Sequence, residues 1–182
     1  MDRAGLAVIL VALAGSTAAA HSEQFPKRDR LALAPSGARV VIDYSIPAGD
    51  EARALRELFD RDHSGALDER ERAQLGEYLA QQAARFVALT VDGAAAALER
   101  VSAEPALGAS ANAGLTVTVT LAARVALGAG EHRVRFADRH KDRRVTVPVA
   151  LALDGLRATT RLDPQPFVFA DHPLDFTIEP SR

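Results

Sequence analysis

Two stretches in which every second residue is valine or leucine constrain the fold more than any other feature of this chain. One runs from Leu115 to Leu121 and the other from Val145 to Leu153. A period of two places every apolar side chain on one face of a strand, whereas a helix would scatter the same residues around its axis. Each stretch is therefore predicted to be a β-strand with one buried face.

Further strands and turns are predicted around these two stretches. Asp92-Gly93, Gly128–Gly130 and Asp154-Gly155 are expected to form tight turns, because glycine permits the backbone geometry of a hairpin. Pro148 favours an edge position or a bulge, since proline donates no backbone hydrogen bond. The expected strands span residues 38–47, 87–91, 94–101, 115–121, 133–136, 145–153 and 156–162.

A change of period interrupts the β pattern after the first predicted strand. Apolar residues recur at helical spacing from Asp50 to Phe59 and from Glu69 to Phe86. The predicted fold class is therefore α+β, an antiparallel β-sandwich-like domain with a helix–loop–helix inserted after the first strand. The expected parts are a polar lead-in over 21–37, the first strand over 38–47, the insertion over 50–86, the β domain over 87–163, and a tail over 164–182 in which Phe167, Phe169 and Phe176 pack.

The first 20 residues have the layout of a cleavable export signal. Arg3 precedes a short apolar run, and small residues end the segment at Ala18-Ala19-Ala20. The apolar run is shorter than the roughly 20 residues that a membrane span requires. We expect cleavage before His21, a single mature domain over 21–182 without a membrane span, and a periplasmic or secreted location. A retained N-terminal anchor is the alternative.

Composition and missing motifs exclude several classes of function. The 182 residues carry a formal net charge of −2, which gives no reason to expect a nucleic-acid partner. The chain has no cysteine, so disulfides, thiolate metal sites and a cysteine nucleophile are excluded. It has no glycine-rich phosphate loop and no nucleophile elbow. The sequence therefore predicts a protein that is not an enzyme.

The segment from Asp60 to Glu71, between the two predicted helices, carries the clearest chemical signal. Calcium takes six to eight oxygen ligands from a loop that wraps the ion. Asp60, Asp62 and Ser64 occupy the first, third and fifth positions, whose side chains point inward. Gly65 at the sixth position permits a sharp bend. The predicted metal ligands are Asp60, Asp62, Ser64, the backbone carbonyl of Ala66, Asp68 through a water, and Glu71 with both carboxylate oxygens.

This pattern resembles the EF-hand calcium-binding family over residues 50–86. Leu67 at the eighth position would anchor the loop to the core, and chance produces such a pattern in about one window per million. The resemblance implies a single EF-hand with Ca²⁺ as its cofactor. EF-hands usually pair, but the best second candidate begins at Asp138 and fails at its sixth and twelfth positions, Arg143 and Val149.

The sequence therefore predicts an exported calcium-binding protein with one EF-hand, a binding or interaction module in which calcium is structural or weakly sensing. The sequence predicts no particular protein partner for this module. The alternative is a periplasmic metal-handling protein, such as a copper or nickel transport accessory factor that uses histidines. His21 motivates this alternative, because an N-terminal amine and imidazole together chelate copper. The basic run over 132–144 would suit an acidic partner or form a solvated hairpin end.

Overall fold

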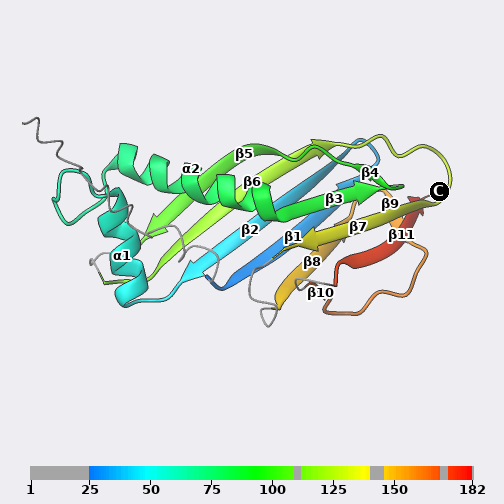
Figure 1. Ribbon diagram of the computed structural model, residues 1–182. Helices are drawn as coiled ribbons and strands as arrows, with labels where there is room; N and C mark the ends of the chain where they lie inside the picture. The colour runs from blue at the N-terminus through cyan, green and yellow to red at the C-terminus, as the bar shows by residue number, and fades with distance from the viewer. Residues whose placement is uncertain (1–24, 109–111, 140–145, 169–171, 182) are drawn as a thin grey trace, which may run out of the picture.

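The computed structural model describes residues 25–108, 112–139, 146–168 and 172–181. Within these residues two helices and eleven strands form an α+β fold with two mostly antiparallel sheets. A six-stranded sheet and a five-stranded sheet contribute apolar side chains to one shared core (Figure 1). The predicted α+β class with mostly antiparallel strands is confirmed, and the arrangement is compatible with a sandwich.

The helices and strands have the following bounds in chain order. They are β1 (Lys27–Ala34), β2 (Gly37–Ile46), α1 (Asp50–Phe59), α2 (Glu69–Phe86), β3 (Val87–Val91), β4 (Ala94–Ala95), β5 (Glu99–Leu107), β6 (Leu115–Arg124), β7 (His132–Asp138), β8 (Val147–Leu153), β9 (Leu156–Ala158), β10 (Phe167–Val168) and β11 (Leu174–Pro180).

The two sheets combine neighbouring and distant parts of the chain. The six-stranded sheet has the order β10-β8-β1-β2-β6-β5, and the five-stranded sheet has the order β4-β3-β7-β11-β9. Strand β1 pairs antiparallel with β2 and parallel with β8. The parallel pair joins an early strand to one more than 100 positions later, a pairing that local periodicity does not reveal.

The alternating stretches form strands, as predicted. In β6 the side chains of Leu115, Val117, Val119 and Leu121 are each exposed by 2% or less, so their shared face lies in the core. The described part of the second stretch forms β8, and Val145 lies outside the described residues. A strand can pair with neighbours along both of its edges without changing this alternation, because side chains stand perpendicular to the sheet.

The expectation of a polar lead-in was wrong for residues 27–34. These residues form β1, which lies between β2 and β8 inside the six-stranded sheet. Leu31 and Leu33 alternate into the core, but Lys27 and Asp29 share their face and hide the apolar pattern. The helical segment consequently follows the second strand of the chain and not the first.

The tail predicted from residue 164 onward also contains strands. Strand β11 pairs with both β7 and β9 within the five-stranded sheet. Phe176 is buried as expected, whereas Phe167 is 49% exposed and does not fill the core. Phe169 lies outside the described residues. The tail therefore contributes β10 to the six-stranded sheet and β11 to the five-stranded sheet.

Only one of the three predicted turns is a hairpin. Asp92-Gly93 joins β3 to β4, which pair directly, with both turn residues at positive φ. Gly128–Gly130 and Asp154-Gly155 instead connect strands of different sheets. The strand expected over 94–101 is divided likewise, because β4 and β5 belong to different sheets. Pro148 lies in β8, one strand in from the edge, where the two-residue β10 pairs with it.

Helix α1 lies at one end of the molecule, and α2 runs from that end along the sheet toward the middle (Figure 1). Helix α2 packs on β5 and β6 and continues directly into β3. Helix α1 buries Ala52, Leu55 and Arg56, whereas its apolar residues Ala54 and Leu58 are exposed. No helix in the described ranges is long and apolar enough to span a membrane.

Candidate metal centre

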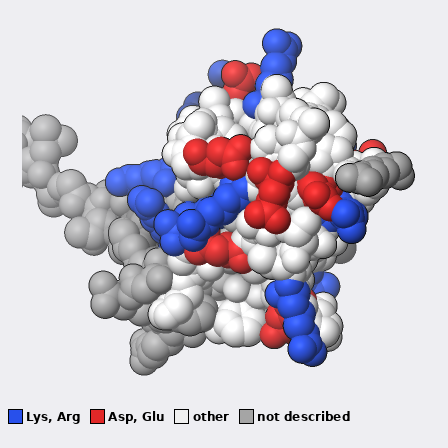
Figure 2. All heavy atoms as spheres, turned by 90° about the vertical axis from the view of Figure 1, so that its right-hand side faces the viewer, with Lys and Arg blue, Asp and Glu red and all other residues white. Residues whose placement is uncertain are grey.

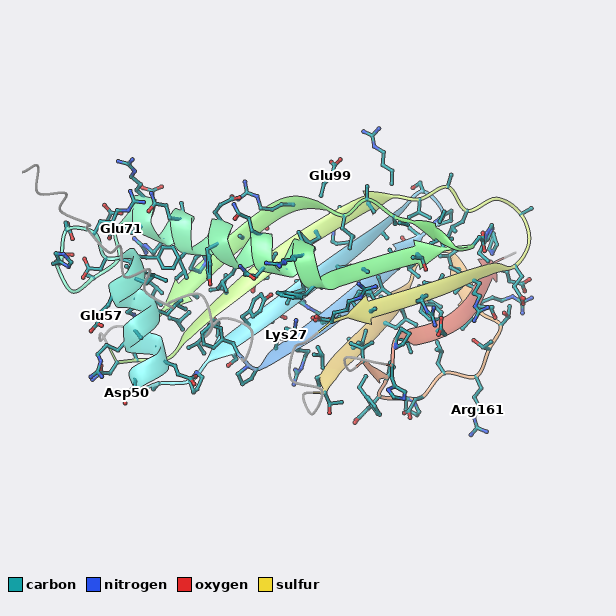
Figure 3. The ribbon with its side chains drawn as sticks, viewed as in Figure 1. Lys27, Asp50, Glu57, Glu71, Glu99 and Arg161 are labelled. Atoms are coloured by element: carbon teal, nitrogen blue, oxygen red, sulfur yellow. The ribbon has the colours of Figure 1, made fainter. Side chains whose placement is uncertain are left out.

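The loop between α1 and α2 is held at both ends by packed helices. At its start, the rings of Phe59 and Tyr78 lie 5.6 Å apart in a tilted arrangement, which joins the end of α1 to the middle of α2. Leu67, near the end of the loop, is 6% exposed and belongs to the core cluster, as predicted. Figure 3 labels Glu71 in the first turn of α2, beside this loop.

Three of the predicted ligands lie close together. Asp60, Asp62 and Glu71 each offer a carboxylate oxygen, and these oxygens lie within 4.8 Å of one another. Asp60 and Glu71 are buried, whereas Asp62 is exposed to solvent. We call these three residues the loop carboxylates. Their spacing suits oxygen ligands that converge on one cation.

Backbone amides orient the two buried carboxylates. Asp60 accepts hydrogen bonds from the backbone N–H groups of Ser64 at 3.0 Å and Gly65 at 2.8 Å. Glu71 accepts from the backbone N–H of Arg61 at 2.7 Å and of Asp68 at 3.0 Å. A carboxylate oxygen has two lone pairs, so each of these oxygens retains acceptor capacity for a metal ion. This donor set fits a hard cation such as calcium.

Asp68 has a structural role that is independent of any metal. It is the N-cap of α2, where its side chain accepts from the backbone N–H of Glu71 at 2.8 Å. The Glu71 side chain accepts in return from the N–H of Asp68, which completes a capping box. Asp68 is not part of the close group of loop carboxylates, so its predicted contact through water remains a prediction.

Ser64 and Ala66 bond to each other. The hydroxyl of Ser64 donates to the carbonyl oxygen of Ala66 at 2.9 Å, and both residues are exposed. Their oxygens therefore lie side by side on the loop, and their role as metal ligands stays a prediction. Gly65 has a φ of 82° and His63 a φ of 55°, so the loop bends sharply there, as the glycine predicted.

The loop carboxylates carry negative charge that no ion pair in the described part of the chain offsets. No ion pair found among those residues includes any of them. Hydrogen bonding by the Ser64 side chain, followed by the Ser64 backbone, holds the pKa of Asp62 below its ordinary value. Three carboxylates at such short separations repel one another, and a bound divalent cation would relieve this repulsion.

The histidines proposed for copper or nickel do not gather in the described residues. No group of three or more metal-binding side chains among those residues contains histidine. His63 is exposed on the loop, and His132 bonds to Asp92 and to the carbonyl oxygen of Gly128. His21 and His140 lie outside the described residues, so the N-terminal chelate stays an untested prediction.

Acidic side chains lie among the basic residues of the run over 132–144. Arg135 on β7 pairs with Asp175 on β11, and Arg157 pairs with Glu179. Figure 2 shows the end of the molecule remote from the helices, where acidic and basic side chains are mixed over the surface. Residues 140–145 lie outside the described part. The described part of the run therefore gives no continuous basic patch on this face.

Sequence reasoning missed a second charged group in the core. Lys27, Asp29 and Asp138 are buried between strands of the two sheets. The available signal was the alternation in β1, which places Lys27 and Asp29 on the same face as Leu31 and Leu33. In the sequence, Asp138 stands out only as the first residue of the second candidate calcium loop, which does not match the calcium-binding pattern.

Comparison with known proteins adds no family assignment. No protein-family model matches the chain, and no curated protein matches it. The chemistry of the site must therefore be inferred from its own residues.

Proposed function

We propose that the loop from Asp60 to Glu71 binds one Ca²⁺ ion as an unpaired EF-hand, in an exported, non-enzymatic binding or interaction protein. The observation that carries this proposal is the convergence of Asp60, Asp62 and Glu71 within 4.8 Å on a twelve-residue loop between two helices. Ser64, Ala66 and Asp68 would complete the oxygen shell, Asp68 through a water.

The role of the ion is proposed to be structural or weakly sensing. Helix α1 is fastened to the connection between β5 and β6 at both of its ends. The backbone N–H of Gly49 donates to Asn112 O at 3.0 Å, and Arg56 Nη1 donates to Ala113 O at 2.6 Å. Calcium that fixes α1 relative to α2 would therefore also stabilise this end of the six-stranded sheet. These bonds oppose a large opening of the helices, such as a paired sensor undergoes.

A calcium site in an exported protein does not have to be tight. Calcium is plentiful outside the cytosol, and extracellular modules function with dissociation constants as weak as about 10⁻⁴–10⁻³ M. The chain lacks a second matching loop, so cooperative sensing is not expected. The partner of the interaction module would be identified by capture from the native periplasm with and without a chelator.

Isothermal titration calorimetry of the chelator-treated protein with Ca²⁺ tests the proposal directly. We expect one site per chain in the wild type and none in Glu71→Gln, which keeps the shape of the side chain but removes its charge. His63→Asn is the matched control, because His63 is an exposed residue outside the predicted ligand set and asparagine tolerates its positive φ. Absence of calcium binding in the wild type refutes the proposal, and tight copper or nickel binding that requires His21 favours the alternative function.

A further inference from the structure

Lys27, Asp29 and Asp138 form a buried group that we call the intersheet cluster. Nζ of Lys27 lies 2.7 Å from Oδ1 and 2.5 Å from Oδ2 of Asp138. The side chains of Lys27 and Asp138 are 5% and 0% exposed, and Asp29 is also fully buried. Figure 3 labels Lys27 near the middle of the molecule, on the strand β1. An amine and a carboxyl group are thus held in contact out of the reach of bulk water.

Asp29 contributes a second carboxyl group to the cluster. Burial, together with the negative charge of Asp138, raises the pKa of Asp29 well above its ordinary value, and the two side chains lie within hydrogen-bonding reach. Neither oxygen of Asp29 meets a donor among the described residues. A buried carboxyl group that meets no donor is favoured in its neutral form, so we infer that Asp29 carries a proton that it can share with Asp138.

The charges of the cluster balance. Its members Lys27 and Asp29 lie on β1 and Asp138 lies on β7, and Tyr44 of β2 lies beside them. The ring of Tyr44 lies opposite Lys27 in the strand register, with its centroid 5.8 Å from Nζ. Burial raises the pKa of the Tyr44 hydroxyl, so it stays neutral. One ammonium, one carboxylate and two neutral groups give no net charge.

We propose that Lys27 and Asp138 are a self-modification site, at which Nζ of Lys27 condenses with the side-chain carboxyl of Asp138 to form an intramolecular amide bond. Asp29 is the catalytic acid–base for this step. The new bond would join β1 of the six-stranded sheet covalently to β7 of the five-stranded sheet.

The step balances without an external reagent. The ammonium of Lys27 first passes one proton to the Asp138 carboxylate, which gives a neutral amine and a neutral acid. The amine then attacks Cγ of Asp138, while the O–H of Asp29 stabilises the developing oxyanion. Asp29 delivers its proton to the departing hydroxyl and takes one from the nitrogen, so it ends protonated as it began. One C–N bond forms, one C–O bond breaks, and one water molecule leaves.

Position and environment both favour this reaction. Two groups held in contact react with effective concentrations that reach about 10⁵ M or more. Exclusion of bulk water opposes the reverse hydrolysis. The linked residues are 111 positions apart, so the bond would restrict the unfolded chain as a disulfide over a long loop does. The chain has no cysteine and thus no disulfide to serve this purpose.

Intact-mass measurement of the folded, exported protein under denaturing conditions tests the proposal. The expected mass is lower, by one water molecule, than the mass calculated from the sequence beginning at the measured N-terminus. Digestion with trypsin should leave the bond after Lys27 uncleaved and release a branched peptide that contains both Lys27 and Asp138. On a denaturing gel the cross-linked chain should migrate faster than an uncross-linked variant.

Two variants separate the reactants from the catalyst. Lys27→Arg keeps a cation beside Asp138 but cannot form the amide. Its measured mass should therefore equal the mass calculated from its sequence, with no loss of water. Asp29→Asn keeps both reacting groups and removes the acid, so it should also show the full mass. A folded wild type with full mass and a linear peptide cleaved after Lys27 overturns the proposal. Loss of water that persists in Lys27→Arg overturns it as well, because the dehydration would then lie elsewhere.

Discussion

Gly76 of α2 lies directly against the backbone of Ala103 in β5. A Cβ atom placed on Gly76 would be 2.9 Å from the carbonyl oxygen of Ala103 and 3.3 Å from its Cβ. Glycine normally weakens a helix interior, and its presence in the middle of α2 is explained by this close approach. The contact sets how near the helix lies to the six-stranded sheet, and thereby positions the first turn of α2, which carries Glu71.

Gly76→Ala should therefore destabilise the protein, although alanine is the better helix former. Overpacking against backbone costs about 1–3 kcal/mol, and helix propensity offsets about 1 kcal/mol of this, so we expect a net loss of about 1 kcal/mol. Urea unfolding in the presence of chelator measures the change. The exposed Ala84 provides the control, because Ala84→Gly should lose about 1 kcal/mol through propensity alone. A rise in stability for Gly76→Ala would contradict the close approach.

The strands with an unbroken apolar face were predictable, and those with charged residues on that face were not. Strand β6 alternates without exception, so its burial follows from sequence alone. Strand β1 places Lys27 and Asp29 in the core, where Lys27 pairs with Asp138 and burial raises the pKa of Asp29. That compensation depends on a partner 111 positions away, which no local pattern reveals.

The candidate site shows the same division between local and distant information. The loop carboxylates lie within one segment of twelve residues, so spacing alone predicted that Asp60, Asp62 and Glu71 converge. The fastening of α1 by Arg56 and Ala113 joins segments 57 positions apart, and helical periodicity had not favoured Arg56 as a buried residue. Long-range pairing of this kind is set by how the layers pack.

Asp68→Ala should weaken the protein even without calcium. The substitution removes the acceptor for the backbone N–H of Glu71 and breaks the capping box of α2. Loss of an N-cap costs about 1 kcal/mol. Thermal unfolding in chelator measures this cost, and Asp68→Asn is the control because asparagine caps as well as aspartate. Equal stability of the alanine and asparagine variants in chelator would show that the cap contributes nothing.

The stability of the protein should fall as pH rises through the pKa of His132. Nδ1 of His132 lies 2.7 Å from Asp92 Oδ2, and Nε2 lies 3.0 Å from Gly128 O. Both nitrogens face acceptors, which favours the doubly protonated imidazolium, and the hydrogen bond to the Asp92 side chain is the main cause of the raised pKa of His132. The folded state then binds more protons than the unfolded state. Its stabilisation is complete below the unfolded pKa of about 6.5 and is lost above the folded pKa.

Melting temperature measured from about pH 6 to pH 8 tests this dependence. Asp92→Asn is the matched variant, because asparagine followed by Gly93 suits the same positive-φ hairpin and its oxygen can still accept from Arg133 N. The variant should show a flatter profile over this range. An unchanged slope in Asp92→Asn would mean that another group titrates.

Calcium should raise the melting temperature of the wild type, and the loop carboxylates should account for the rise. If the dissociation constant is about 10 μM, a calcium concentration of about 1 mM is about 100 times that constant. Calcium then stabilises the folded state by about 2.7 kcal/mol. This corresponds to a shift of roughly 5–10 °C for a domain of this size. Glu71→Gln and Asp60→Ala should each abolish most of the shift, because each removes a buried carboxylate of the group. His63→Asn should retain it. A Glu71→Gln protein that responds to calcium like the wild type would exclude the loop as the site of stabilisation.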